Sequence, residues 1–86
     1  MNRYILHYTL KNHNWLGYVS VENQISSLGN AWRHNVCPTI LRLDSELSPM
    51  QLQSQMNSFL DLKNGDTYYV AQISEYRSKC SWTKLN

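Results

Sequence analysis

The chain has 86 residues, 42% of them hydrophobic, and its 8 basic and 6 acidic residues give a net charge of +2. This length suits one small domain, and the composition excludes a disordered chain. The charge is well below that of a dedicated nucleic-acid binder with a dense basic surface, although it permits nucleic-acid contact.

The cysteine and hydropathy patterns favour a cytoplasmic protein with reduced thiols. Cys37 and Cys80 do not form a C-x-x-C pair and are weak evidence for a disulfide. Cys37 precedes a turn proline and is expected to be a small buried group rather than a nucleophile. No apolar run is long enough for a membrane span or fits a signal peptide, so no membrane partner is expected.

Residues 3–10 are predicted to form the first strand, because their side chains alternate in polarity. The more apolar set should face the core: Tyr4, Leu6, Tyr8 and Leu10. The other set should face the opposite side of the sheet: Arg3, Ile5, His7 and Thr9.

Residues 15–28 are predicted to form the first helix, because apolar residues recur at spacings of three and four. Gly29 and Asn30 should end it, since both tolerate a left-handed backbone. Two strands follow at 31–36 and 39–43, joined by a tight turn at the Cys37–Pro38 pair. Ile40 and Arg42 should share one face of the second of these strands.

The second helix has the clearest local signature. Ser48 is the expected N-cap, Pro49 the first helical residue, and Gln51 the partner in a capping box. The helix is expected to extend to Lys63 in its last turn. Residues 67–73 form a last strong strand, and the polar tail with Trp82 leaves room for a short C-terminal edge strand.

This order predicts a single α+β domain over residues 1–86 with a ferredoxin-like βαββαβ fold. Two helices should cover one face of an antiparallel four-stranded sheet. The other face stays open, and it should carry Ile5 and Ile40 beside polar groups. An open face of this kind requires a partner.

Several segments resemble the SinR-like proteins and the CRISPR-associated Cas-two family. The likeness lies in the first strand, in Leu28-Gly29 followed by an aromatic-rich strand, in Leu47-Ser48-Pro49 before a helix, and in Trp82 of the tail. The resemblance implies a symmetric homodimer and a role either as a metal-dependent nuclease or as a non-catalytic bridge that holds DNA. A dimer through the open face would place these residues in its interface: Ile5, His7, Thr9 and Ile40.

The family's proposed metal ligand is an aspartate that follows a tyrosine near the end of the first strand. Here Thr9 follows Tyr8, and a neutral hydroxyl is a poor primary ligand for Mg²⁺. We therefore expect no metal, no cofactor and no firm catalytic residue, with His7 and Thr9 as weak candidates. For His7, a polar interface role is favoured over a general base.

Three arginines are candidates for phosphate contacts near the open face: Arg3, Arg33 and Arg42. Trp15 and Trp32 could stack on bases, although packing is the favoured interpretation. His13 and His34 are expected to be surface groups.

Three functions remain open. The first is a non-catalytic, homodimeric Cas-two-like protein that binds the DNA or RNA backbone. The second is a protein-interaction or inhibitory module of a mobile element or defence system. The third is a divergent metal-dependent endoribonuclease or nuclease that uses His7.

Overall fold

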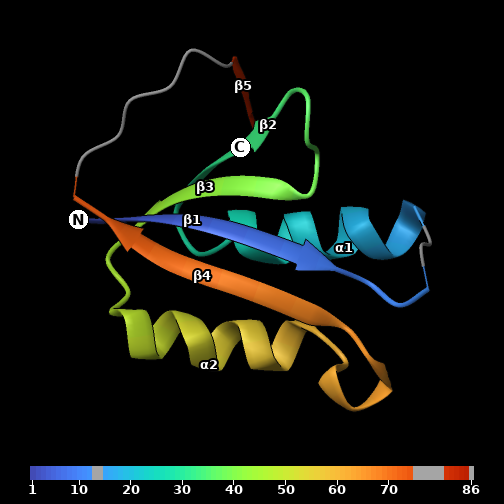
Figure 1. The fold of residues 1–86 in the computed structure, drawn as a ribbon. Helices are drawn as coiled ribbons and strands as arrows, with labels where there is room; N and C mark the ends of the chain where they lie inside the picture. Colours follow the sequence, from blue (N-terminus) through green and yellow to red (C-terminus); the bar gives the residue numbers. More distant parts are fainter. Residues whose placement is uncertain (13–14, 75–80, 86) are drawn as a thin grey trace.

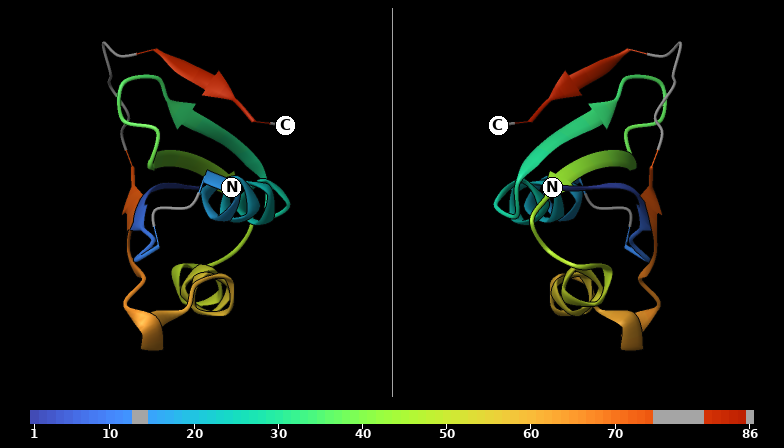
Figure 2. Two further views of the ribbon diagram at one scale, coloured as in Figure 1. Left: turned by 90° about the vertical axis from the view of Figure 1, so that its right-hand side faces the viewer. Right: turned by 90° about the vertical axis from the view of Figure 1, so that its left-hand side faces the viewer.

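A computed structural model describes residues 1–12, 15–74 and 81–85. Its elements are β1 (Asn2–Thr9), α1 (Trp15–Ser26), β2 (Asn30–His34), β3 (Ile40–Ser45), α2 (Pro49–Phe59), the 3₁₀ helix η1 (Leu62–Asn64), β4 (Thr67–Ile73) and β5 (Trp82–Lys84). The strands form one antiparallel sheet in the order β4-β1-β3-β2-β5 (Figure 1). Figure 2 shows α1 and α2 on the same face of this sheet.

The protein is therefore α+β, with two helices and an antiparallel five-stranded sheet in the described part of the chain, and is consistent with a ferredoxin-like fold. The prediction of four strands was wrong by one. The tail contributes β5, which pairs with β2 at the edge of the sheet. This is the short edge strand for which the tail had left room. Neither described helix combines the length and apolar character needed to cross a membrane.

The core lies between the sheet and the two helices. The predicted inward set of the first strand is confirmed, because Tyr4, Leu6 and Tyr8 are fully buried and Leu10 is nearly so. They belong to one cluster with buried residues of the neighbouring strands and helices, namely Ala31, Leu41, Leu43, Val21, Ile25, Leu52, Met56 and Leu60. The Tyr4 hydroxyl donates a 2.6 Å hydrogen bond to the Leu47 carbonyl, which satisfies its buried polar end.

A glycine is required at position 29, after α1, but not for the left-handed backbone that was predicted there. Among the described residues only Gly65 has a positive φ, so neither Gly29 nor Asn30 adopts the left-handed backbone, and Asn30 begins β2. A Cβ on Gly29 would collide with the backbone carbonyl oxygen of Asp44. The glycine is therefore needed because the chain leaving α1 passes close to the backbone of β3.

The start of α2 matches its prediction, and its end does not. Ser48 Oγ accepts from the Gln51 N–H at 3.2 Å, and Gln51 Oε1 accepts from the Ser48 N–H at 2.9 Å. The helix ends at Phe59, so the prediction that it extends to Lys63 was wrong, and Lys63 lies in η1. The physical reason is Asp66, whose carboxylate accepts from the N–H groups of Asp61 and Lys11 at 2.9 and 3.0 Å.

The turn between β2 and β3 forms as predicted, since the two strands pair antiparallel on either side of residues 35–39. Cys37 is exposed in this turn, which contradicts the prediction of a small buried group. The turn folds around the His34 ring instead of around the thiol. Cys80 and His13 lie outside the described residues.

Candidate nucleic-acid interface

Alternate residues of all five strands form the face of the sheet that points away from the helices (Figure 2). One row across this face contains, in register, Ala71, Ile5, Arg42, Trp32 and Lys84. A second row contains Tyr69, His7 and Ile40, and continues on β2 and β5 with His34 and Trp82. We call these two rows the open face. Neither row contains an acidic residue.

The predicted sharing of one face by four residues is confirmed. Ile5, His7 and Thr9 alternate on β1, and Ile40 lies directly opposite His7 on β3. All four side chains are partly buried. Their predicted role as a dimer interface remains a prediction.

Trp32 lies between two cations. The guanidinium carbon of Arg42 lies 3.8 Å from the centroid of the Trp32 ring, and Lys84 Nζ lies 5.8 Å from the same centroid. The Arg42 guanidinium is also 5.9 Å from the ring of Trp82. These distances are in the range of cation–π attraction, so the rings hold the flat guanidinium in place on the sheet.

His34 was predicted to be a surface group, but its ring contacts both the β2–β3 turn and Trp82 of this cluster. Its Nδ1 accepts from the N–H groups of Val36 and Cys37 at 3.1 and 3.0 Å. Its ring meets Trp82 edge to face, with centroids 5.0 Å apart and an interplanar angle of 77°. One side chain therefore ties the β2–β3 turn to β5, and this contact positions Trp82 next to Arg42.

The β4 end of the open face is aromatic and uncharged. Tyr69 is 73% exposed, and its ring stacks on that of His7 with centroids 6.2 Å apart. Ile5 and Ile40 lie beside this pair. A flat, accessible tyrosine ring of this kind suits stacking against a nucleotide base or packing against a protein surface.

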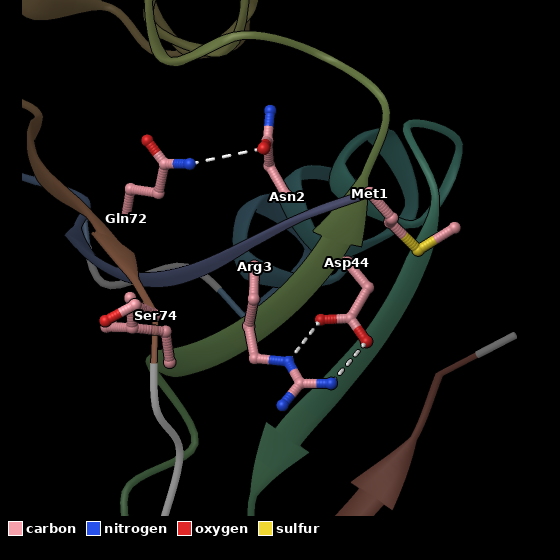
Figure 3. Close-up of a pocket in the computed structure, with 7 residues that line it drawn as sticks. Met1, Asn2, Arg3, Asp44, Gln72 and Ser74 are labelled. Carbon is pink, nitrogen blue, oxygen red and sulfur yellow. Dashed lines mark hydrogen bonds and ion pairs between the residues drawn. The ribbon is translucent and has the colours of Figure 1, made fainter.

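Arg3 also lies on this side of the sheet, but its charge is compensated. Its Nε and Nη2 donate to the two carboxylate oxygens of Asp44 at 3.0 and 3.4 Å (Figure 3). Beside this pair, the Gln72 side-chain amide donates to Asn2 Oδ1 at 3.2 Å. These residues line a hollow of about 420 Å³ at the start of β1. Because the Asp44 carboxylate neutralises its charge, Arg3 is a poor candidate for a phosphate contact.

The prediction that Arg33 lies near the open face was wrong. Arg33 is opposite the buried Leu41 and therefore points to the helix side of the sheet. There its Nη1 lies 3.6 Å from Glu22 Oε2 of α1. The three arginines thus divide into one paired with Asp44, one paired with a helix carboxylate, and Arg42 on the aromatic cluster.

Glu22 and Arg33 border a pocket of about 280 Å³ under α1. Trp15, 69% exposed at the start of α1, borders the same pocket and therefore lies far from Trp32 on the opposite side of the sheet. Burial raises the pKa of Glu22 above its ordinary value, and the Arg33 charge offsets this effect only in part. Burial also raises the pKa of the Tyr8 hydroxyl, with a further contribution from the Glu22 charge.

The end of β1 does not present a carboxylate to the open face. Thr9 lies opposite Thr67, and the nearby Asp66 uses both of its oxygens to accept from backbone N–H groups. No group of three or more His, Cys, Asp or Glu side chains suited to a metal ion occurs among residues 1–12, 15–74 and 81–85. His7 and Thr9 share this face, but their weak candidacy as catalytic residues has no acidic partner there.

No family model, curated protein or solved structure matches the chain. The resemblance to SinR-like and Cas-two proteins therefore remains a prediction. Sequence reasoning missed Tyr69, Lys84 and the role of His34. The alternation in residues 67–73 could have placed Tyr69 on the open face, whereas the position of Lys84 depends on the pairing of β5 with β2.

Proposed function

We propose that this protein is a non-catalytic binding domain of the ferredoxin-like, Cas-two-like type, which binds single-stranded nucleic acid on its open face. The Arg42–Trp32–Lys84 row carries this proposal. Two cations from neighbouring strands, Arg42 and Lys84, lie against the same Trp32 ring, and the two rows contain no acidic side chain. A phosphate of a nucleic-acid backbone would accept hydrogen bonds from both cations at this point of the sheet.

Base stacking would supplement the phosphate contacts. The Arg42 guanidinium plane and the exposed ring of Tyr69 lie on the same face, separated by β1. Strand spacing places residues on β4 and β3 about 10 Å apart, a span that one or two nucleotides can bridge. Aromatic rings and arginine planes on an exposed sheet are a common platform for unpaired bases.

We propose a non-catalytic role because the residues at the end of β1 are poorly suited to hold a metal ion. Thr9 contributes a neutral hydroxyl, and the Asp66 carboxylate is engaged by the backbone of Lys11 and Asp61. Hydrolysis of a phosphodiester by the family's route needs an anionic oxygen to hold Mg²⁺ at this position. A metal-titrated cleavage assay, with His7→Ala and Thr9→Ala as controls, tests the nuclease alternative.

The binding experiment is fluorescence anisotropy with a labelled oligothymidine or oligouridine strand across a salt series. If Arg42 and Lys84 each contact one phosphate, the slope of log Kobs against log[salt] is about −1.4 for a single strand. Arg42→Ala and Lys84→Ala should each weaken binding and reduce the slope. Lys63→Ala removes an exposed lysine in η1, away from the open face, and serves as the matched control.

Two results would overturn the proposal: no binding at low salt, or an equal loss of affinity in the Lys63→Ala control. Quenching of tryptophan fluorescence on binding gives an independent readout, because Trp32 and Trp82 flank Arg42. Binding without any change in that fluorescence would place the nucleic acid elsewhere on the molecule.

A protein-binding function is the second candidate, because the β4 end of the open face is uncharged. Tyr69, Ile5 and Ile40 form an apolar area of the kind that protein partners cover. A pull-down after nuclease treatment that retains one stoichiometric protein, and loses it with Tyr69→Ser, would favour this function over nucleic-acid binding.

A further inference from the structure

The outer edge of β4 lacks the usual protection of an edge strand. In the described part of the chain β4 pairs only with β1, and the pairing register from Arg3–Ile73 to Thr9–Thr67 is continuous, without a bulge. Residues 67–73 contain no proline and no charged side chain. Native proteins block long edges with such features, because unpaired N–H and C=O groups recruit another strand.

The opposite edge of the sheet is protected. β5 has only three residues and ends with Lys84 (Figure 1). Short strands and lysines are two of the devices that prevent edge pairing. A molecule with one open and one protected edge can pair once and then stop, which gives a closed dimer and not a filament.

We propose that β4 pairs antiparallel with β4 of a second copy, across a two-fold axis at Val70. A two-fold axis perpendicular to a sheet keeps the helices of both copies on the same side. In such a pairing, residues directly opposite each other on the two β4 strands must point to the same side of the sheet. Centring the axis on Val70 satisfies this condition and pairs the whole strand, so that Tyr69 faces Ala71 of the partner subunit.

The neutrality of this edge favours a second copy as its occupant. Any charge on a self-pairing strand recurs on the partner close to the same axis, where like charges repel. A groove of about 570 Å³ runs along the edge between β4 and α2. It contains no charged residue, and its walls are formed by Pro49, Met50 and Gln53 of α2 and by Tyr68, Tyr69, Val70 and Gln72 of β4. The partner's Val70 would point to the side on which this groove lies.

Two large exposed side chains on either side of the edge would gain cover from the same contact. Met50 is 80% exposed on the α2 side, and Tyr69 is 73% exposed on the open face. The dimer would join the two open faces into one continuous surface with the Tyr69 rings near its centre. This last consequence depends on the proposed nucleic-acid function, whereas the pairing itself does not.

The test uses charge pairs that only this register brings together, with sedimentation velocity in the absence of nucleic acid. Tyr69→Lys/Ala71→Lys places lysines opposite lysines, and Tyr69→Lys/Ala71→Glu places lysines opposite glutamates. We expect the wild type and the Lys/Glu variant to be dimers at submillimolar concentration, and the Lys/Lys variant to be a monomer. Circular dichroism confirms that each variant is folded.

Hydrogen exchange of the wild type gives a readout that does not depend on any substitution. Dilution to low micromolar concentration should increase the exchange of amides in residues 67–73 more than that of amides in β3. The proposal is overturned by a wild type that stays monomeric, by a Lys/Lys variant that stays dimeric, or by assemblies larger than a dimer. Loss of the dimer in Ile40→Glu, with no effect of the Lys/Lys change, would instead place the interface on the open face.

Discussion

Gly29 shows how a single missing side chain determines where two strands can lie. A Cβ at this position would meet the backbone of Asp44, and a backbone atom cannot rotate away. Gly29→Ala should therefore cost about 1–3 kcal/mol of unfolding free energy, the range for overpacking against rigid neighbours. Urea titration monitored by circular dichroism measures this difference.

The matched control is Gly17→Ala in α1. Its added Cβ would meet Leu10 Cδ1 at 3.1 Å, the far end of a side chain that can adjust. Alanine also favours the helical backbone over glycine by up to about 1 kcal/mol. We expect Gly17→Ala to be neutral or stabilising, and equal destabilisation by the two changes would refute the argument from backbone proximity.

Glu22 gives the protein a pH dependence whose sign follows from its raised pKa. The folded state binds a proton on the Glu22 carboxyl more tightly than the unfolded state does. The contribution of Glu22 to the free energy of unfolding therefore falls as the pH rises from about 4.5 through the folded pKa. Glu22→Gln removes this effect but also weakens the contact with Arg33. Its stability relative to the wild type should therefore increase between pH 4 and neutrality.

The magnitude is small, because Glu22 is only partly buried. After allowance for solvent screening we expect less than about 1 kcal/mol across the titration. Urea midpoints at several pH values measure it, with Glu46→Gln as the control on an exposed carboxylate. A relative stability that decreases over the same interval would show that the Arg33 contact outweighs burial.

At the scale of elements, the N-terminus of α2 depends on a reciprocal pair of hydrogen bonds. The Ser48 hydroxyl and the Gln51 amide each accept from the other residue's backbone N–H. Ser48→Ala should cost about 1 kcal/mol, the usual value for an N-cap. Ser54→Ala, at an exposed position inside the same helix, should change stability by a few tenths at most, and a similar loss in both variants would contradict a capping role.

Elements with local signals were predictable from the sequence. The faces of β1 follow from alternation, and the start of α2 follows from Ser48, Pro49 and Gln51. The end of α2 was not predicted, because the Asp66 carboxylate accepts from the Asp61 N–H five residues earlier and is itself held by the N–H of the distant Lys11. A contact between residues 55 positions apart leaves no periodic trace in either segment.

The candidate site was predicted in part, for a related reason. Arg42 follows from its alternation with Leu41 and Leu43, and it lies on the open face as expected. The same rule applied to β2 would have placed Arg33 beside Ala31 on the core side. The tail left room for β5, but the short polar segment offers no pattern from which to infer that β5 pairs with β2 and places Lys84 beside Trp32.

At the scale of the whole molecule, a chain of 86 residues has little apolar surface to bury, so the proposed dimer would add appreciably to its stability. If β4 pairs with a second copy, dilution dissociates the dimer and removes the part of the stability that comes from this pairing. Apparent stability should therefore rise with protein concentration, by up to about 1.4 kcal/mol per mole of dimer for each tenfold increase.

Thermal and urea midpoints over two decades of concentration test this linkage. The Tyr69→Lys/Ala71→Lys variant is the control, because its midpoint should not depend on concentration and should match that of the most dilute wild type. The comparison separates association from local strand stability, since both substituted positions are exposed on β4 and point away from the core. A wild-type midpoint that is constant across the series would mean that the domain folds without a partner and that the β4 edge stays unpaired.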